Sequence, residues 1–267
     1  MIQLFATDID GTLLDENRFL SHRTIKTLKE LTIPKILISA RMPQAMYYLQ
    51  DALDIMGEAI ICYNGALVLH GDEVLFELGI PFDEVQALAA IGEEHGLHVA
   101  FYRNEEWFVP ALDHWANREI NNTRVHPTVQ STAVTLDYLK ETSEKGNAHK
   151  VMFMGDEDGM DLAFAKAEKE LTSKVHLYRS KNTYTEITPK GTSKEVALRK
   201  LLEFRFPDIA MKNVVAFGDN YNDTDMLKAV GYGVAVENGR DEVKKAAAYI
   251  TAHHKKDGVA IWLEENT

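Results

Sequence analysis

Two aspartates near the N-terminus stand where an apolar run gives way to glycine. Asp8 and Asp10 close the run, and Gly11 and Thr12 follow at once. Residues i and i+2 of a strand point to the same side, so a strand continuing through Asp10 would bring both carboxylates into one pocket. Two such charges repel one another unless a cation or a shared proton compensates. Because Mg²⁺ takes carboxylate, carbonyl, water and phosphate oxygens, we expect this pair to form half of a magnesium site.

The other half should be acidic and distant in sequence, and a second cluster meets that description. Val214–Phe217 is another apolar run, and it leads through Gly218 to Asp219, Asn222 and Asp223. In an open α/β sheet, ligands bind outside the carboxyl ends of the strands. Acidic groups at the ends of two such strands can therefore meet in one site.

Taken together, these two motifs resemble those of the haloacid dehalogenase-like (HAD) phosphotransferase superfamily. More narrowly, the chain resembles the Cof-type sugar-phosphatase branch, whose members carry a C2-type (IIB) cap. The stretch Ala235–Gly239 and the segments after it also follow the Cof-type pattern, although Glu237 and Gly239 stand where that pattern has Gly and Ala. The resemblance covers nearly the whole chain on both sides of an insertion.

This resemblance implies a role for each residue of the first motif. Asp8 would be the nucleophile, because a carboxylate can attack phosphorus to give an aspartyl phosphate. Asp10 would be the general acid for the leaving oxygen and then the general base for water. Gly11 and Thr12 would form a turn whose backbone N–H groups face phosphate oxygens. The implied Mg²⁺ ligands are the carboxylates of Asp8 and Asp219 and the backbone carbonyl of Asp10.

Four residues after two other strands match the family less specifically. A hydroxyl at Ser39 and the backbone N–H of Ala40 can bind a phosphoryl oxygen at a helix N-terminus. The family usually has Gly at the second position, so Ala40 would be strained if the turn needs a positive φ. Arg41 is expected either to contact the residues that bind the substrate, without binding it directly, or to be a structural ion-pair partner. Asn64, before Gly65, either faces the substrate entrance or forms a plain hairpin turn.

A lysine that neutralises the phosphate is expected near a helix start. The resemblance favours Lys194 over Lys190, because Gly191–Lys194 matches the family's gly-val-ser-lys pattern. An ammonium between the nucleophile and the phosphoryl group would reduce the repulsion of two anions before attack. Asn222 is expected to donate to the phosphoryl group. Asp223 is expected to orient the site rather than to bind the metal directly.

The elements that must position these residues alternate between strand and helix. Repeated strand–helix units predict a parallel sheet with helices on both faces, so the fold class is α/β with a doubly wound, Rossmann-like core. From Pro81 the pattern changes to a helix, a hairpin and further mixed elements. We therefore predict a catalytic core of residues 1–80 and 188–267, and an inserted α/β cap of residues 81–187. The cap would set substrate specificity, with five basic residues available: Arg103, His114, Arg124, His126 and Lys150.

Composition excludes several classes of function. The chain has 267 residues, a formal net charge of −12 and one cysteine, Cys62. No basic patch suggests nucleic-acid binding, and no apolar stretch is long enough for a membrane span. The single cysteine and the absence of a signal pattern favour the cytoplasm. We expect a monomer or a weak homo-oligomer.

These observations predict a Mg²⁺-dependent phosphatase for small phosphorylated metabolites, with sugar phosphates as the leading class. A phosphomutase or phosphotransferase on the same scaffold is the first alternative, since the chemistry differs only in the acceptor. A metabolite-sensing protein without catalysis is a weaker alternative, because Asp8, Asp10, Lys194 and Asp219 are all present.

Overall fold

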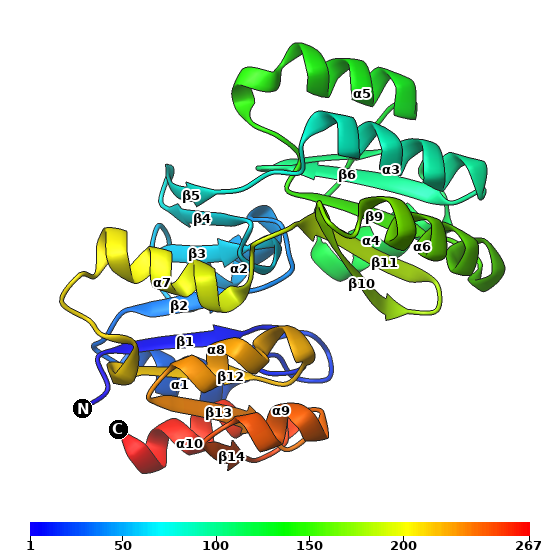
Figure 1. The fold of residues 1–267 in the computed structure, drawn as a ribbon. Helices are drawn as coiled ribbons and strands as arrows, with labels where there is room; N and C mark the ends of the chain where they lie inside the picture. The colour runs from blue at the N-terminus through cyan, green and yellow to red at the C-terminus, as the bar shows by residue number, and fades with distance from the viewer. The chain divides into compact units, whose positions relative to one another are not determined.

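The predicted motif residues belong to an eight-stranded sheet with the order β14-β13-β12-β1-β2-β3-β4-β5. The computed structural model describes residues 1–267, and Figure 1 labels the strands of this sheet. Strands β14 to β3 pair in parallel, whereas β4 and β5 pair antiparallel at one edge. The strands are β1 (Leu4–Asp8), β2 (Lys35–Ile38), β3 (Ala59–Cys62), β4 (Leu67–His70), β5 (Glu73–Glu77), β12 (Val214–Gly218), β13 (Tyr232–Val236) and β14 (Tyr249–Thr251).

Helices cover both faces of this sheet. Residues of β1, β2, β3 and β12 pack in one buried apolar cluster with residues of α7 (Lys194–Arg205), α8 (Thr224–Ala229) and α9 (Asp241–Ala246). Two helices on the other face contact each other, α1 (His22–Glu30) and α10 (Gly258–Asn266), and α2 (Gln44–Ala52) follows β2. The central strands are buried throughout, which is why their sequences read as continuous apolar runs.

The inserted residues form a second sheet with the order β10-β11-β9-β6-β7-β8. Its pairs are antiparallel except for β7 and β8. The strands are β6 (His98–Arg103), β7 (Glu106–Val109), β8 (Thr128–Val129), β9 (Lys150–Met154), β10 (Val175–Lys181) and β11 (Tyr184–Pro189). One face of the sheet packs against α3 (Phe82–Glu94), α5 (Thr132–Glu141) and α6 (Glu157–Leu171).

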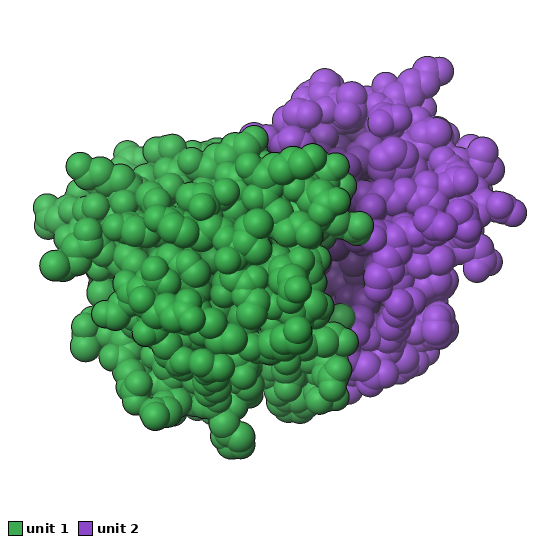
Figure 2. Space-filling view, turned by 90° about the horizontal axis from the view of Figure 1, so that it is seen from below, with its two compact units in different colours: residues 1–41, 46–77, 193–267 green, residues 42–45, 78–192 purple.

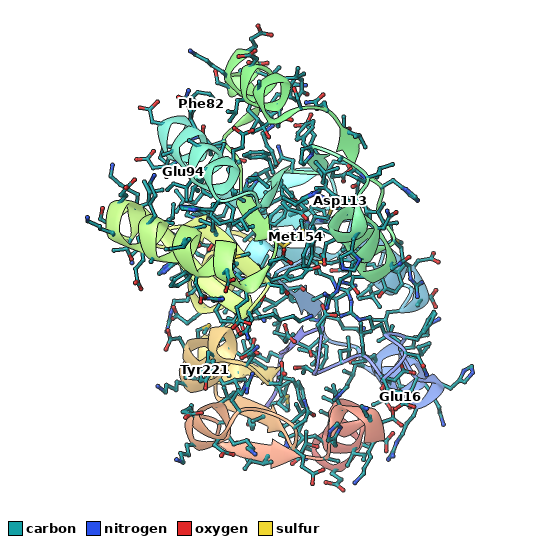
Figure 3. The ribbon with its side chains drawn as sticks, turned by 90° about the vertical axis from the view of Figure 1, so that its right-hand side faces the viewer. Glu16, Phe82, Glu94, Asp113, Met154 and Tyr221 are labelled. Atoms are coloured by element: carbon teal, nitrogen blue, oxygen red, sulfur yellow. The ribbon has the colours of Figure 1, made fainter.

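Helix α4 (His114–Thr123) contacts side chains that point away from that apolar cluster. Asp113 caps α4 and bonds to His98 of β6, and Trp115 meets Tyr184 edge-on. Figure 3 labels Asp113, Met154 at the end of β9, and the two ends of α3, Phe82 and Glu94.

The chain thus has the predicted α/β fold, with a mainly parallel core sheet and a separate mixed sheet. It divides into unit 1, residues 1–41, 46–77 and 193–267, and unit 2, residues 42–45 and 78–192, coloured green and purple in Figure 2. The role of residues 81–187 as a substrate-selecting cap stays a prediction.

The remaining helical elements are short 3-10 turns. They lie at Tyr63–Gly65, Ser143–Lys145, Met211–Asn213, Tyr221–Asp223 and His254–Lys256. None of the helices is both long and apolar enough to cross a membrane.

Candidate active site

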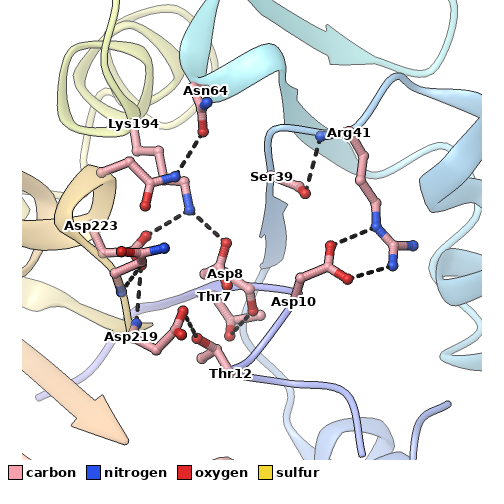
Figure 4. A network of polar contacts seen from close by, with 12 residues as sticks. Thr7, Asp8, Asp10, Thr12, Ser39, Arg41, Asn64, Lys194, Asp219 and Asp223 are labelled. Carbon is pink, nitrogen blue, oxygen red and sulfur yellow. Dashed lines mark hydrogen bonds and ion pairs between the residues drawn. The ribbon is translucent and has the colours of Figure 1, made fainter. Parts of the chain in front are cut away.

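The predicted site residues gather at the carboxyl edge of the eight-stranded sheet (Figure 4). Asp8 is the last residue of β1, and Asp219 directly follows β12, its neighbour. Ser39 directly follows β2, and Asn64 lies in the turn after β3. The order of neighbouring strands therefore brings together residues that lie far apart in the sequence, as the open α/β topology requires.

A buried lysine joins the two acidic motifs. Lys194 is the first residue of α7, whose N-cap Ser193 accepts a hydrogen bond from the backbone N–H of Val196. Its Nζ donates to Asp8 Oδ1 at 2.5 Å and to Asp223 Oδ1 at 2.6 Å. The side chains of Lys194 and Asp223 are both 0% exposed. An ammonium in such a place survives only because it is paired, and both carboxylates raise the pKa of Lys194 against the effect of burial.

Asp223 holds this arrangement in place through its second oxygen. Asp223 Oδ2 accepts hydrogen bonds from the backbone N–H groups of Asp219 and Asn220, each at 3.0 Å. Both of its oxygens are thus engaged, one with the lysine and one with the loop after β12. The alternative lysine of the sequence analysis, Lys190, is exposed.

The acidic cluster fits a divalent cation. Carboxylate oxygens of Asp8, Asp219 and Asp223 all lie within 4.8 Å of one another. Asp8 Oδ2 is buried and has no hydrogen-bond partner. Burial, opposed by Lys194 and helped by the two neighbouring carboxylates, raises the pKa of Asp8 to about 8, and burial with Asp223 raises that of Asp219 to about 6. A hard cation with oxygen ligands would relieve this repulsion. The free oxygen of Asp8 and the carboxylate of Asp219 are the groups placed to hold it.

The carboxylate of Asp10 does not share a pocket with that of Asp8 in the way a continuous strand would dictate. The strand ends at Asp8, and Asp10 lies in a turn where Ile9 O accepts N–H groups from Thr12, Leu13 and Leu14. The condition for a shared pocket, a strand that continues through Asp10, is not met, because this turn closes directly after β1. A backbone ligand role for Asp10 remains compatible with this geometry.

Instead, the Asp10 carboxylate faces Arg41. Arg41 Nε donates to Asp10 Oδ2 at 2.7 Å and Nη2 donates to Asp10 Oδ1 at 2.8 Å. Partial burial would raise the pKa of Asp10, but the hydrogen bonds and charge of Arg41 hold it below its usual range. Asp10 is therefore ionised in this state.

Gly11 and Thr12 contact Asp219 directly. Gly11 has φ +87°, and a Cβ at this position would stand 2.6 Å from Asp219 Oδ2. Thr12 Oγ1 donates to Asp219 Oδ1 at 3.2 Å. Whether their backbone N–H groups also face a phosphate stays a prediction, but the absence of a side chain at Gly11 and the hydroxyl of Thr12 allow the observed position of the Asp219 carboxylate.

The turns after β2 and β3 contribute polar groups. Ser39 Oγ accepts the backbone N–H of Arg41 at 3.2 Å, and Ala40 is not among the residues with positive φ, so the feared strain is absent. Asn64 adopts φ 56°, and its Oδ1 accepts from Asn222 Nδ2 at 2.9 Å. Asn222 Oδ1 is buried and has no hydrogen-bond partner, and the predicted donation to a phosphoryl oxygen would come from Nδ2.

The sequence analysis missed two supporting residues, Asn238 and His254. Asn238 follows β13, the next strand along the edge, and its Nδ2 donates to Gly11 O at 2.7 Å. Asn238 Oδ1 accepts the backbone N–H of His254 at 3.0 Å, and His254 Nδ1 lies 2.6 Å from Leu14 O. A polar residue at the end of one more parallel strand was the available signal.

Among the basic residues proposed for specificity in unit 2, Arg103 is not available. Its side chain is 0% exposed and binds Glu106 and Thr142. Lys150 is also buried, with its Nζ 4.3 Å from the centre of the Tyr102 ring. The sequence left open which of these basic residues face a substrate, and Arg103 is a packing residue because its guanidinium binds partners inside unit 2.

The chain is similar to known proteins over almost its whole length. Residues 5–263 match the family model of the haloacid dehalogenase-like hydrolases. The chain belongs to this family. It is 29% identical over 264 residues to the pyridoxal phosphate phosphatase YbhA of Escherichia coli, covering 97% of this chain and 96% of the relative.

Solved structures show the same architecture. A haloacid dehalogenase-like hydrolase from Bacteroides thetaiotaomicron superposes with a TM-score of 0.89 at 27% identity, covering 100% of both chains. The subclass IIB sugar phosphatase BT4131 has the same fold, with a TM-score of 0.79 at 24% identity over 98% of each chain. The chain is thus a haloacid dehalogenase-like hydrolase, and its fold is also that of a subclass IIB sugar phosphatase.

Proposed function

We propose that this protein is a Mg²⁺-dependent phosphatase that hydrolyses small phosphorylated metabolites, with sugar phosphates as the leading class, through an aspartyl phosphate. The observation that carries the proposal is the buried Lys194 ammonium between Asp8 and Asp223, next to an Asp8 oxygen without a partner. Family membership supports hydrolase chemistry, and the relative that acts on pyridoxal phosphate supports a small metabolite as substrate.

In the first half of the reaction, the carboxylate of Asp8 attacks phosphorus, and the bond to the leaving oxygen breaks. Lys194 lowers the repulsion between the incoming phosphate and the carboxylate of Asp8, because it lies 2.5 Å from that carboxylate. A phosphate dianion near Asp10 favours the protonated form of this carboxyl. Asp10 then gives its proton to the leaving oxygen.

In the second half, Asp10 accepts a proton from water, and the resulting hydroxide attacks the phosphorus of the aspartyl phosphate. The Asp8–phosphate bond breaks, inorganic phosphate leaves, and Asp8 returns as a carboxylate. Mg²⁺, when bound, would supply charge neutralisation between the phosphoryl oxygens and the acidic cluster. Asn222 and Ser39 would hold phosphoryl oxygens, and unit 2 would select the substrate.

The proposal is tested by phosphate release from a panel of sugar phosphates, pyridoxal phosphate, nucleotides and phosphoglycolate. Each compound is assayed with Mg²⁺, with a chelator, and with the Asp8→Asn variant, whose amide cannot act as the nucleophile. We expect release that depends on the metal and is lost in the variant. A free sugar added as acceptor separates hydrolysis from transfer. If the folded protein with Mg²⁺ releases phosphate from no compound, the proposal is wrong.

A further inference from the structure

The Asp10 carboxylate is held at both of its oxygens by one side chain. Arg41 approaches it edge-on, with Nε 2.7 Å from Oδ2 and Nη2 2.8 Å from Oδ1 (Figure 4). This is the paired geometry in which a guanidinium fixes both the position and the plane of a carboxylate. Lysine cannot reproduce it, because an ammonium is a point charge without a fork.

Arg41 is itself firmly placed. Its side chain is 7% exposed, whereas that of Asp10 is 42% exposed. Its remaining terminal nitrogen, Nη1, donates to the hydroxyl of Tyr48 at 3.1 Å. Its backbone is tied at both groups, since the N–H donates to Ser39 Oγ and the carbonyl accepts from the N–H of Tyr63. A half-exposed carboxylate is thus bound to a buried and fixed guanidinium.

Only the Asp10 partner of this ion pair is exposed, and the fixed geometry of the pair can serve the reaction by orienting that carboxylate. Asp10 lies in a turn, and both oxygens of its carboxylate accept hydrogen bonds from Arg41. Proton transfer needs the donor within hydrogen-bond reach of the leaving oxygen in the right direction. Without the fork, the Asp10 carboxylate would sample several rotamers, and the productive one would be populated less often.

We infer that Arg41 is a positioning residue of the reaction, whose guanidinium fork holds the Asp10 carboxylate in the orientation that proton transfer to the leaving oxygen requires. This inference rests on the proposed function. Arg41 does not touch the substrate in this role. Its contribution to kcat/KM should therefore be large for a leaving group that needs a proton and small for one that does not. A purely structural effect of Arg41 would lower kcat/KM equally for both kinds of substrate.

The experiment compares two substrates with different leaving groups. An alkoxide leaving from an aliphatic phosphate ester needs a proton, whereas p-nitrophenolate from p-nitrophenyl phosphate leaves as a stable anion. The value of kcat/KM is measured for both substrates in the wild type and in Arg41→Lys, Arg41→Gln and Asp10→Asn. Arg23→Lys is the matched control, since Arg23 binds Glu264 through the same two nitrogens on an exposed surface of unit 1.

We expect Arg41→Lys and Arg41→Gln to lower kcat/KM about 10- to 100-fold for the aliphatic ester, a part of the roughly 10²–10⁴-fold that general acid catalysis contributes. The loss for p-nitrophenyl phosphate should be about threefold or less. Asp10→Asn should shift the ratio of the two values in the same direction, and Arg23→Lys should leave it unchanged.

Equal losses for the two substrates in both Arg41 variants would overturn the inference, because they indicate phosphate binding or a structural effect. Unchanged kcat/KM for the aliphatic ester would overturn it as well. A wild type that hydrolyses neither substrate refutes the proposed function itself, so the two failures are distinguishable. Thermal unfolding of each variant shows whether a loss follows from unfolding, and two Arg41 variants keep the comparison decisive if one of them folds poorly.

Discussion

Replacing Gly11 with alanine should damage the active site far more than it destabilises the fold. Gly11 has φ +87°, so an alanine there adopts a left-handed conformation that costs about 1–2 kcal/mol. The new Cβ would stand 2.6 Å from Asp219 Oδ2, so this oxygen has to retreat to at least 3.4 Å, a shift of about 0.8 Å. The displaced atom is the end of a short side chain, and its movement adds little to the free energy of unfolding.

The same shift of Asp219 Oδ2 is large for the catalytic rate. Asp219 is the proposed metal ligand at the end of β12, and its other oxygen is held by Thr12 at 3.2 Å. A misplacement close to 1 Å in a catalytic site can lower the rate on the order of a hundredfold. We therefore expect Gly11→Ala to lower kcat/KM by about that factor and to weaken Mg²⁺ binding.

Gly57 provides a matched control for the backbone strain. It has φ +84°, and a Cβ there would meet nothing within 4 Å. Urea denaturation should show similar losses of unfolding free energy for Gly11→Ala and Gly57→Ala, about 1–2 kcal/mol each. Phosphate release should fall only in the first. Wild-type kcat/KM in Gly11→Ala, or an equal loss of activity in both variants, would refute the reasoning.

Three further predictions concern the buried charges and one surface pair. Lys194→Met should abolish phosphate release and lower the free energy of unfolding by about 3–5 kcal/mol in urea denaturation, because two buried carboxylates lose their partner. Mg²⁺ at about 100 times its Kd should raise the unfolding free energy by about 2.7 kcal/mol in the wild type and not in Asp219→Asn. Arg23 and Thr27 lower the pKa of Glu264 from 4.5 to about 2 by hydrogen bonding. Glu264 thus stabilises the fold above pH 4.5 and loses this effect as the pH falls towards 2, so the difference in unfolding temperature between the wild type and Glu264→Gln should vanish over that range.

The sequence revealed the central strands and the residues that end them, because both signals are local. Strands buried on both faces read as continuous apolar runs, and the polar residue after each run marks the carboxyl edge. Asp8 and Asp219 were found in this way. The edge strands β5 and β14 were not predicted, because they are short and their residues are mostly exposed.

The contacts between loops could not be predicted from local sequence. Arg41 binds Asp10 across 31 positions and Asn238 binds Gly11 across 227. Nothing in either short segment specifies the partner, since strand order alone brings them together. The orientation of Arg103 was left open for a similar reason, since its burial follows only from its contacts with Glu106 and Thr142.

The charges of the site favour a divalent cation over a monovalent one. When all three are ionised, Asp8, Asp219 and Asp223 carry −3 and Lys194 carries +1, which leaves −2 in a cluster whose carboxylate oxygens lie within 4.8 Å of one another. The Asp10–Arg41 pair is neutral by itself and does not alter this sum. Buried charge of that size is costly unless it is compensated nearby. One divalent ion would bring the cluster to neutrality, and a phosphate dianion could then approach Asp8 without meeting a net negative site, even in a protein whose overall charge is −12.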